Sequence, residues 1–188
     1  MDRRNFLVTS AGSMLVATSP FLFSTEGWGS NKTTITHSKK TTGTGLSRRQ
    51  WKTIVAVQDH LFPSEKNSPG AGDVNAKAFF YAVLSDASRD DEDRKLVKEG
   101  LITLQDICWK KYKQTFIELK HELREEALRA FEKTTNGTAW IMTVLGYIFE
   151  ALLTDPVYGG NPDGAGWKWL GHQPGFPRPT IDKRYFLL

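Results

Sequence analysis

Apolar residues recur every three to four positions along most of the chain between residues 47 and 153, which is the spacing of helices that bury one face. Ser47 and Gln50 stand at the start of the first such stretch, and their spacing matches a helix-capping box. Pro63 stops the pattern. A first helix is therefore predicted between Ser47 and Pro63, with an apolar face made of Trp51, Ile54, Val55, Val57, Leu61 and Phe62.

The same periodicity predicts two further helices in the middle of the chain. Asp73 is expected to cap the second, whose apolar residues are Phe79, Phe80, Val83 and Leu84. A third is expected after the acid-rich "SRDDEDR", with acids in its first turn, where the helix dipole favours them. A break is expected near residues 119–121, at the end of an apolar stripe made of Leu96/Val97, Leu101, Leu104, Cys108, Tyr112 and Phe116.

Two more helices complete the periodic part of the chain. The stretch "ELREEALRAFEK" is amphipathic, with Leu123, Ala127, Leu128 and Phe131 on its inner side. The stretch "AWIMTVLGYIFEALL" is apolar nearly all round but too short to span a membrane, so it is predicted to be the central core helix. No stretch alternates with period two. The predicted fold is all-α, a single bundle of about five helices followed by a long ordered loop.

That loop, residues 155–179, is rich in glycine, proline and aromatic residues. Its aromatic side chains have apolar surface to bury and its prolines stiffen the chain, so it is expected to be ordered. A cap over the bundle and a surface for a partner protein are compatible roles. Tyr158, Trp167 and Trp169 are expected to pack partly on the bundle, whereas Asn161, Lys168 and His172 are expected on an outer face that meets a partner.

The first 23 residues have the layout of an export signal. Arg3 and Arg4 are followed by Phe6 and Leu7, and then by a weakly apolar run that is too short for a membrane span. This start resembles a twin-arginine signal, and the alternatives are an uncleaved anchor or a chance match. Residues 24–45 are rich in Ser, Thr, Gly and Lys and are predicted to be a flexible linker, which leaves residues 46–188 as the helical domain.

Composition and charge exclude several functions. The net charge is +4, and acidic and basic residues are interleaved between residues 89 and 133, so no basic footprint for nucleic acid is present. The sequence has no dinucleotide-binding glycine motif, no P-loop and no haem-attachment motif. His60, His121 and His172 lack ligand spacing. No catalytic, cofactor-binding or metal-binding residue is therefore predicted in this chain.

The chain has one cysteine, Cys108. In an exported protein a lone cysteine forms an intermolecular bridge or stays a free thiol. Its place on the apolar stripe favours a buried free thiol.

The C-terminal sequence "LLTDPVYGGNPDGAGWKWLGHQPGFPRP" resembles the signature of the gluconate 2-dehydrogenase subunit 3 family. The stretches "LSRRQWKTIVAVQDHLFPS" and "SPGAGDVNAKAFF" are similar to the first two helices of that family, and the resemblance covers about residues 46–179. Lys120 departs from it, because a Ser or Thr cap is expected there.

This resemblance implies the small subunit of a membrane-associated sugar or sugar-acid dehydrogenase. It implies a GMC-type large subunit that carries FAD, often a multihaem cytochrome c subunit, and no active site in the small subunit. The small subunit would supply the export signal to the twin-arginine machinery for a partner that lacks one, which implies a periplasmic complex peripheral to the inner membrane. The alternative is a stand-alone exported enzyme or ligand-binding protein that uses Asp155, Asn161 and His172.

Overall fold

The structure is a computed structural model that describes residues 43–86 and 91–184. Within these ranges the chain forms six α-helices and three short 3-10 helices, and it has no β-strand. The all-α prediction is confirmed. The predicted export signal, with Arg3, Arg4, Phe6 and Leu7, lies outside the described residues, as does most of the predicted linker.

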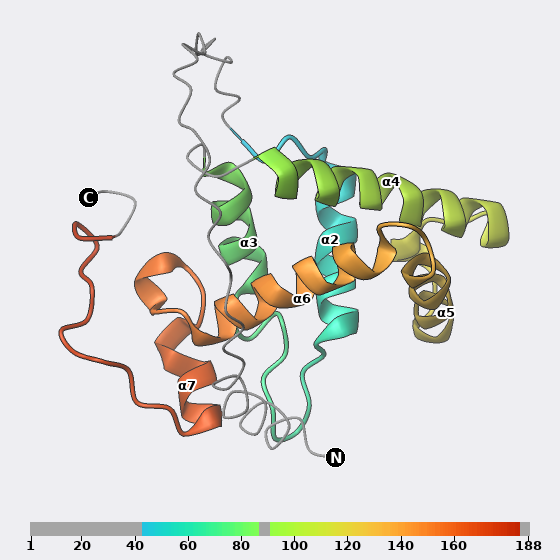
Figure 1. Ribbon diagram of the computed structural model, residues 1–188. Helices are drawn as coiled ribbons and strands as arrows, with labels where there is room; N and C mark the ends of the chain where they lie inside the picture. The colour runs from blue at the N-terminus through green and yellow to red at the C-terminus, as the bar shows by residue number, and fades with distance from the viewer. Residues whose placement is uncertain (1–42, 87–90, 185–188) are drawn as a thin grey trace, which may run out of the picture. The chain divides into compact units, whose positions relative to one another are not determined.

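Figure 1 shows the helices in chain order. The α-helices are α2 (Arg48–Leu61), α3 (Ala76–Ser85), α4 (Asp91–Tyr112), α5 (His121–Glu132), α6 (Gly137–Leu153) and α7 (Ala165–Leu170). The 3-10 helices are η1 (Phe116–Glu118), η2 (Pro156–Tyr158) and η3 (Pro162–Gly164).

Helix α2 begins as its sequence predicts. The Ser47 hydroxyl accepts a hydrogen bond from the Gln50 amide at 3.3 Å, and the Gln50 side chain accepts one from the Ser47 amide at 2.9 Å. This reciprocal pair satisfies two amides that a helix start leaves without partners. Ile54 and Val57 on its inner face are fully buried, and the helix ends just before Phe62 and Pro63.

The predicted cap of the second helix is wrong. The residue before α3 is Asn75, with φ 54°, and Asp73 lies in the preceding turn. The Asp73 carboxylate accepts a hydrogen bond from the Gly70 amide at 2.8 Å and another from the Ser64 hydroxyl, and these bonds lower its pKa. Asp73 therefore closes the turn between α2 and α3 instead of capping a helix.

Helix α4 has begun by Asp91, and Asp91, Glu92 and Asp93 lie in its first turn, as predicted, although the helix includes part of the "SRDDEDR" stretch instead of following it. Its C-terminal end departs from the prediction. It ends at Tyr112, and Phe116 lies on the separate helix η1. Lys113, directly after α4, has φ 57°, and a second capping box then starts η1, in which the Glu118 carboxylate accepts bonds from the Thr115 amide and hydroxyl, each at 2.8 Å.

Helix α5 begins after Lys120, whose side chain makes no capping bond. This agrees with the missing Ser or Thr noted at that position. Ala127, Leu128 and Phe131 are buried as predicted, whereas Leu123 is half-buried.

Helix α6 contacts each of the other five α-helices, so it is the central helix of the bundle. Its inner face carries Trp140, which is fully buried and donates from Nε1 to the Val97 carbonyl oxygen at 3.0 Å. The Trp140 ring also meets the Phe131 ring edge-on, with centroids 5.2 Å apart. Burial of this face stabilises the domain mainly through the hydrophobic effect.

The prediction of a core helix holds for only one face of α6. Val144, Ile148 and Ala151 are fully buried, but Met142 and Leu153 are 62% and 50% exposed. Two further residues that the periodicity placed in the core, Leu145 and Phe149, are half-buried. The sequence could not separate the two faces because both are apolar.

Cys108 is fully buried on α4 and has no disulfide partner. Burial raises the pKa of its thiol to about 11, so it stays protonated and unreactive at neutral pH. The prediction of a buried free thiol is confirmed.

Candidate functional site

Residues 154–184, the C-terminal segment, are more regular than the loop that the sequence suggests. The segment contains η2, η3 and the short helix α7. Gly164 and Gly171 flank α7 with φ values of 67° and 68°, a conformation that glycine adopts without steric cost. Trp167 and Trp169 therefore project from a helix, so the predicted long loop is in part helical.

Asn161 anchors this segment and is fully buried. Its amide donates to the Val74 carbonyl oxygen at 2.9 Å, and its side-chain nitrogen donates to the Thr154 carbonyl oxygen at 3.0 Å. Its side-chain oxygen accepts from the Gly166 amide at 2.7 Å. The expectation that Asn161 faces outward is therefore wrong, because its polar groups satisfy main-chain groups of three separate stretches.

Trp167 packs into the bundle and is 7% exposed. Its Nε1 donates to the Leu153 carbonyl oxygen at 2.7 Å, which joins α7 to the end of α6. Gly166 makes this close approach possible, since a Cβ there would lie 2.1 Å from the Leu152 carbonyl oxygen. Tyr158 and Trp169 are half-buried, and the Trp169 ring lies 6.4 Å from the Phe62 ring.

An ion pair fastens the far end of the segment. Arg178 donates from Nε and Nη2 to the Asp155 carboxylate at 2.8 and 3.2 Å, and its guanidinium lies over the Trp167 ring. The hydrogen bond from Arg178 lowers the pKa of Asp155. Asp155 also accepts from the Val157 amide at 3.1 Å. Asp155 and Asn161 are thus held in structural contacts.

The remaining polar candidates lie at the surface. Lys168 and His172 are exposed, and the His172 amide donates to the Trp167 carbonyl oxygen at 2.8 Å. Phe176 is also exposed, at 85%. Most described residues after Gly171 are exposed, and Arg178 is the one among them that reaches back to Asp155.

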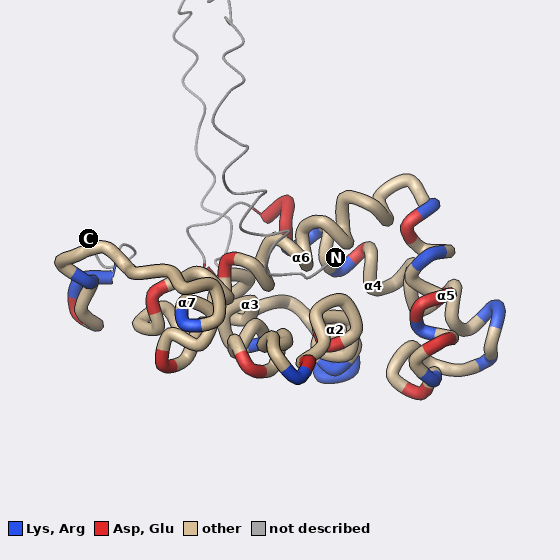
Figure 2. Tube along the Cα trace, turned by 90° about the horizontal axis from the view of Figure 1, so that it is seen from below, with Lys and Arg blue, Asp and Glu red and all other residues tan. Residues whose placement is uncertain are grey.

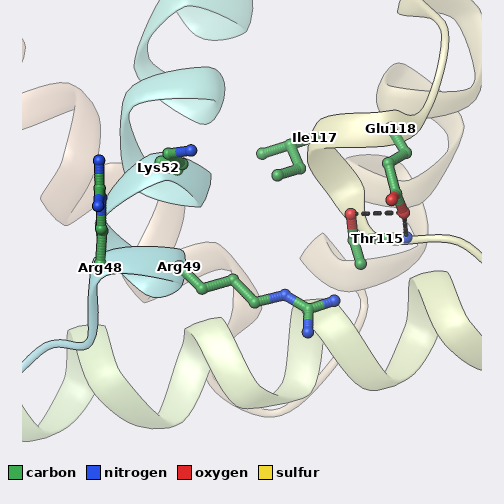
Figure 3. A pocket seen from close by; sticks show the side chains of 6 residues that line it. All are labelled: Arg48, Arg49, Lys52, Thr115, Ile117 and Glu118. Carbon is green, nitrogen blue, oxygen red and sulfur yellow. Dashed lines mark hydrogen bonds between the residues drawn. The ribbon is translucent and has the colours of Figure 1, made fainter.

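A basic hollow of about 670 Å³ lies between the start of α2 and η1. Figure 3 shows Arg48, Arg49 and Lys52 on one side, opposite Thr115 and Glu118. The hydrogen bonds from Thr115 lower the pKa of Glu118 and hold this carboxylate in the capping box of η1. The hollow therefore has a positive wall and an acid that already has partners.

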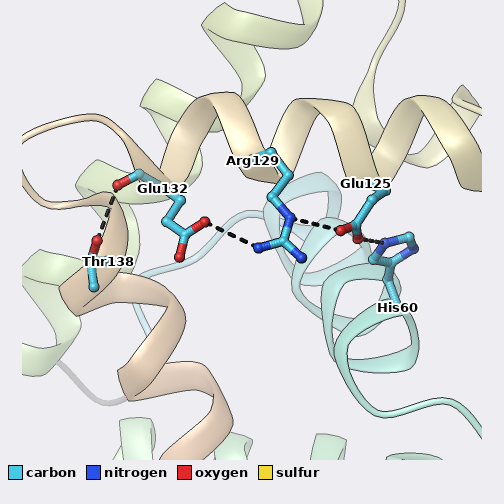
Figure 4. A network of polar contacts seen from close by, with 5 residues as sticks. All are labelled: His60, Glu125, Arg129, Glu132 and Thr138. Carbon is cyan, nitrogen blue, oxygen red and sulfur yellow. Dashed lines mark hydrogen bonds and ion pairs between the residues drawn. The ribbon is translucent and has the colours of Figure 1, made fainter.

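A polar network links α2, α5 and α6 (Figure 4). His60 Nε2 lies 2.9 Å from the Glu125 carboxylate, and Arg129 donates to the same carboxylate at 2.9 Å. Thr138 donates to the Glu132 carbonyl oxygen at 3.1 Å. Across residues 43–86 and 91–184, no group of three or more His, Cys, Asp or Glu side chains could hold a metal ion.

Sequence analysis missed the outer face of α6. Met142, Leu145, Phe149 and Leu153 follow one another at spacings of three, four and four residues, so they form one stripe along the helix. We call this the α6 stripe. The sequence already indicates this face, because α6 is apolar nearly all round. Such a helix can bury a second face in addition to the one that packs in the core. Within the described residues no helix is long and apolar enough to cross a membrane.

The comparison with protein-family models agrees with the resemblance in the sequence. A model of the family described as Gluconate 2-dehydrogenase subunit 3 matches residues 48–175, which include all six described α-helices and most of the C-terminal segment. Searches among curated proteins and among solved structures gave no match.

Proposed function

The chain belongs to the gluconate 2-dehydrogenase subunit 3 family, whose members are subunits of sugar-acid dehydrogenase complexes, and from this membership we propose that it is the non-catalytic small subunit of such a complex. In this proposal a GMC-type large subunit binds FAD and carries out the oxidation. A multihaem cytochrome c subunit passes the electrons onward. The small subunit supports the folding and export of the large one.

The observation that carries this proposal is that residues of the family's C-terminal signature hold the C-terminal segment on the bundle. Asn161 bonds to main-chain groups near α3, α6 and α7, and Trp167 locks α7 onto α6. These hydrogen bonds hold the C-terminal segment on the bundle, and a surface that is held in one shape binds a partner protein at a lower entropic cost. Asp155 and Asn161, which a stand-alone site would use, are already engaged, so the geometry favours a binding subunit.

The start of the chain supports an export role. Arg3 and Arg4, followed by Phe6, Leu7 and a short apolar run, have the order of a twin-arginine signal. Twin-arginine export carries folded proteins, so a large subunit bound to this chain would cross with it. We place the complex in the periplasm, peripheral to the inner membrane.

Co-production of this chain with the large subunit tests the proposal. Wild-type chain should give periplasmic dehydrogenase activity, whereas the double variant Arg3→Lys and Arg4→Lys should leave activity in the cytoplasm. A variant with Lys39→Arg and Lys40→Arg, a tandem basic pair in the predicted linker, serves as a matched control for two conservative changes of adjacent basic residues. Periplasmic activity that does not depend on this chain would contradict the proposal.

A further inference from the structure

We propose that the α6 stripe, together with Trp169, is the surface on which the flavin-binding large subunit docks. This inference rests on the proposed function and adds the location of the contact. The stripe lies on the opposite side of α6 from the buried residues Trp140, Val144 and Ile148, so one helix serves both the core and this surface.

The exposed fractions show that the bundle covers this stripe only in part. Met142 is 62% exposed and Leu153 is 50% exposed, and Leu145 and Phe149 between them are half-buried. The stripe covers about 16 Å along the helix, from the helical rise per residue. A row of this length matches the apolar centre of a protein interface, which a polar rim then surrounds.

Charge distinguishes this surface from other exposed apolar residues. Glu150 is the only charged residue among the 17 residues of α6, and α6 is almost entirely tan in Figure 2, whereas α5 carries many charges. Ile102 on α4 is 51% exposed, but its neighbours one turn away include the exposed residues Lys98, Glu99 and Asp106. Depletion of charge is the compositional mark of an interface core, whereas single apolar residues among charges are ordinary surface.

The stripe continues onto α7, which carries part of the family's signature. The Phe62 ring touches Phe149 edge-on with centroids 6.2 Å apart, and it touches Trp169 at 6.4 Å. Phe149 and Trp169 therefore lie against the same buried ring. Half-buried aromatic side chains that are held in place make good anchors for a partner. Gly146, between Leu145 and Phe149, has open space above its Cα, so a partner's backbone can come close there.

The chemistry of α6 favours a protein partner over a lipid surface. Helices that lie on membranes carry Lys or Arg beside their apolar face, because anionic lipids attract these cations. Helix α6 has neither residue. The occupant that fits is an uncharged apolar groove or helix face on the large subunit.

Capture by the tagged large subunit tests the location. The full chain is co-produced with it as wild type, Met142→Glu, Leu153→Glu or Ile102→Glu. The Ile102 and Leu153 variants are matched, because these residues are 51% and 50% exposed and receive the same charge. A buried uncompensated charge should lower the amount captured on the order of tenfold for Met142→Glu and Leu153→Glu. Ile102→Glu should stay within about twofold of wild type, as surface changes do.

The outcomes separate this inference from the proposed function. If the wild-type chain is not captured, the proposed function fails and the docking surface fails with it. If wild type is captured and both α6 variants are captured equally well, only the surface is wrong. Circular dichroism should show unchanged thermal midpoints for all three variants, and a large loss in an α6 variant would mean that the stripe belongs to the fold.

Two other occupants would overturn the proposal. Flotation of the wild-type chain with phosphatidylglycerol vesicles, abolished by Met142→Glu, would assign the stripe to lipid. A dimer in analytical ultracentrifugation that Met142→Glu dissociates, with capture unchanged, would assign it to a second copy of this chain.

Discussion

The C-terminal segment up to Leu170 and the outer face of α6 lie next to each other, yet they differ in which side chains they bury. The C-terminal segment buries a polar residue, Asn161, completely and keeps Trp167 at 7% exposure. The outer face of α6 leaves Met142 62% exposed and is almost without charge. The C-terminal segment uses Asn161 and Trp167 for hydrogen bonds within the chain, whereas the outer face of α6 leaves apolar side chains exposed.

This difference separates the two roles that the sequence suggests for residues 155–179, a cap over the bundle and a surface for a partner protein. A residue that closes main-chain hydrogen bonds determines the shape of a surface, and a residue that stays exposed and apolar is available for contact. Asn161 and Trp167 belong to the first group, and the α6 stripe belongs to the second. Trp169 connects them, since it is half-buried against Phe62 beside Phe149.

Removal of Trp167 should give the largest loss of stability. Trp167→Ala removes a packed ring and the bond to the Leu153 carbonyl oxygen, and large aromatic truncations in cores cost about 3–5 kcal/mol. Thermal unfolding followed by circular dichroism measures this loss. Trp167→Phe keeps most of the packing and should lose less. A midpoint equal to wild type for Trp167→Ala would show that the segment is not attached to the core through this residue.

The two faces of α6 should respond differently to the same truncation. Ile148 is fully buried, so Ile148→Ala should cost about 2–5 kcal/mol through lost burial and a cavity. Leu145 is half-buried, so Leu145→Ala should cost clearly less in the isolated chain. Urea unfolding of both variants compares them. Equal losses would mean that the stripe is core, and the contrast between the regions would disappear.

Asn161→Ala should come next in size. It leaves the Gly166 amide and the Thr154 carbonyl oxygen without their partner, and an unsatisfied buried group costs about 1–3 kcal/mol. Asn161→Asp keeps the acceptor for Gly166 but places a carboxylate oxygen against the Thr154 carbonyl oxygen, so it should also be less stable than wild type. Chemical denaturation should rank wild type first, then the other two in either order. If Asn161→Ala is as stable as wild type, the hydrogen bonds of Asn161 do not explain why it is buried.

The smallest effect should be the pH dependence of the Asp155–Arg178 pair. The pair lowers the pKa of Asp155 in the folded state, so its contribution is present above the unfolded value of about 3.9 and is lost as pH falls through the lower folded value. Arg178→Ala should therefore lower the thermal midpoint slightly near pH 7, and the difference should shrink below about pH 4. A difference that grows in acid would contradict this assignment.

Local sequence patterns predicted the structure correctly where a pattern has only one common structural result. Ser47 and Gln50 predicted the start of α2, and the stripe on α4 placed Cys108 inside. Thr115 and Glu118 have the same spacing and start η1, but the apolar stripe continues to Phe116, so periodicity alone does not show where α4 ends. Asp73 failed as a predicted cap because an aspartate closes turns as readily as it caps helices.

The candidate site was less predictable because its bonds join stretches far apart in the chain. Asn161 reaches Val74, a partner that no local pattern indicates. The apolar content of α6 is the same on both faces, and only tertiary packing shows which one the bundle covers. Trp167 and the half-buried Tyr158 and Trp169 agree with the expected packing, whereas the interface roles of Lys168 and His172 stay predictions.

Hydroxyl-radical footprinting of the chain, alone and bound to the large subunit, tests the central claim most directly. Met142 on α6 and Trp109 on α4 are 62% and 55% exposed, and both side chains oxidise readily, so each serves as a probe in one experiment. The account predicts that complex formation protects Met142 strongly and leaves Trp109 as reactive as in the isolated chain. Undiminished oxidation of Met142 in the complex would contradict docking on the α6 stripe.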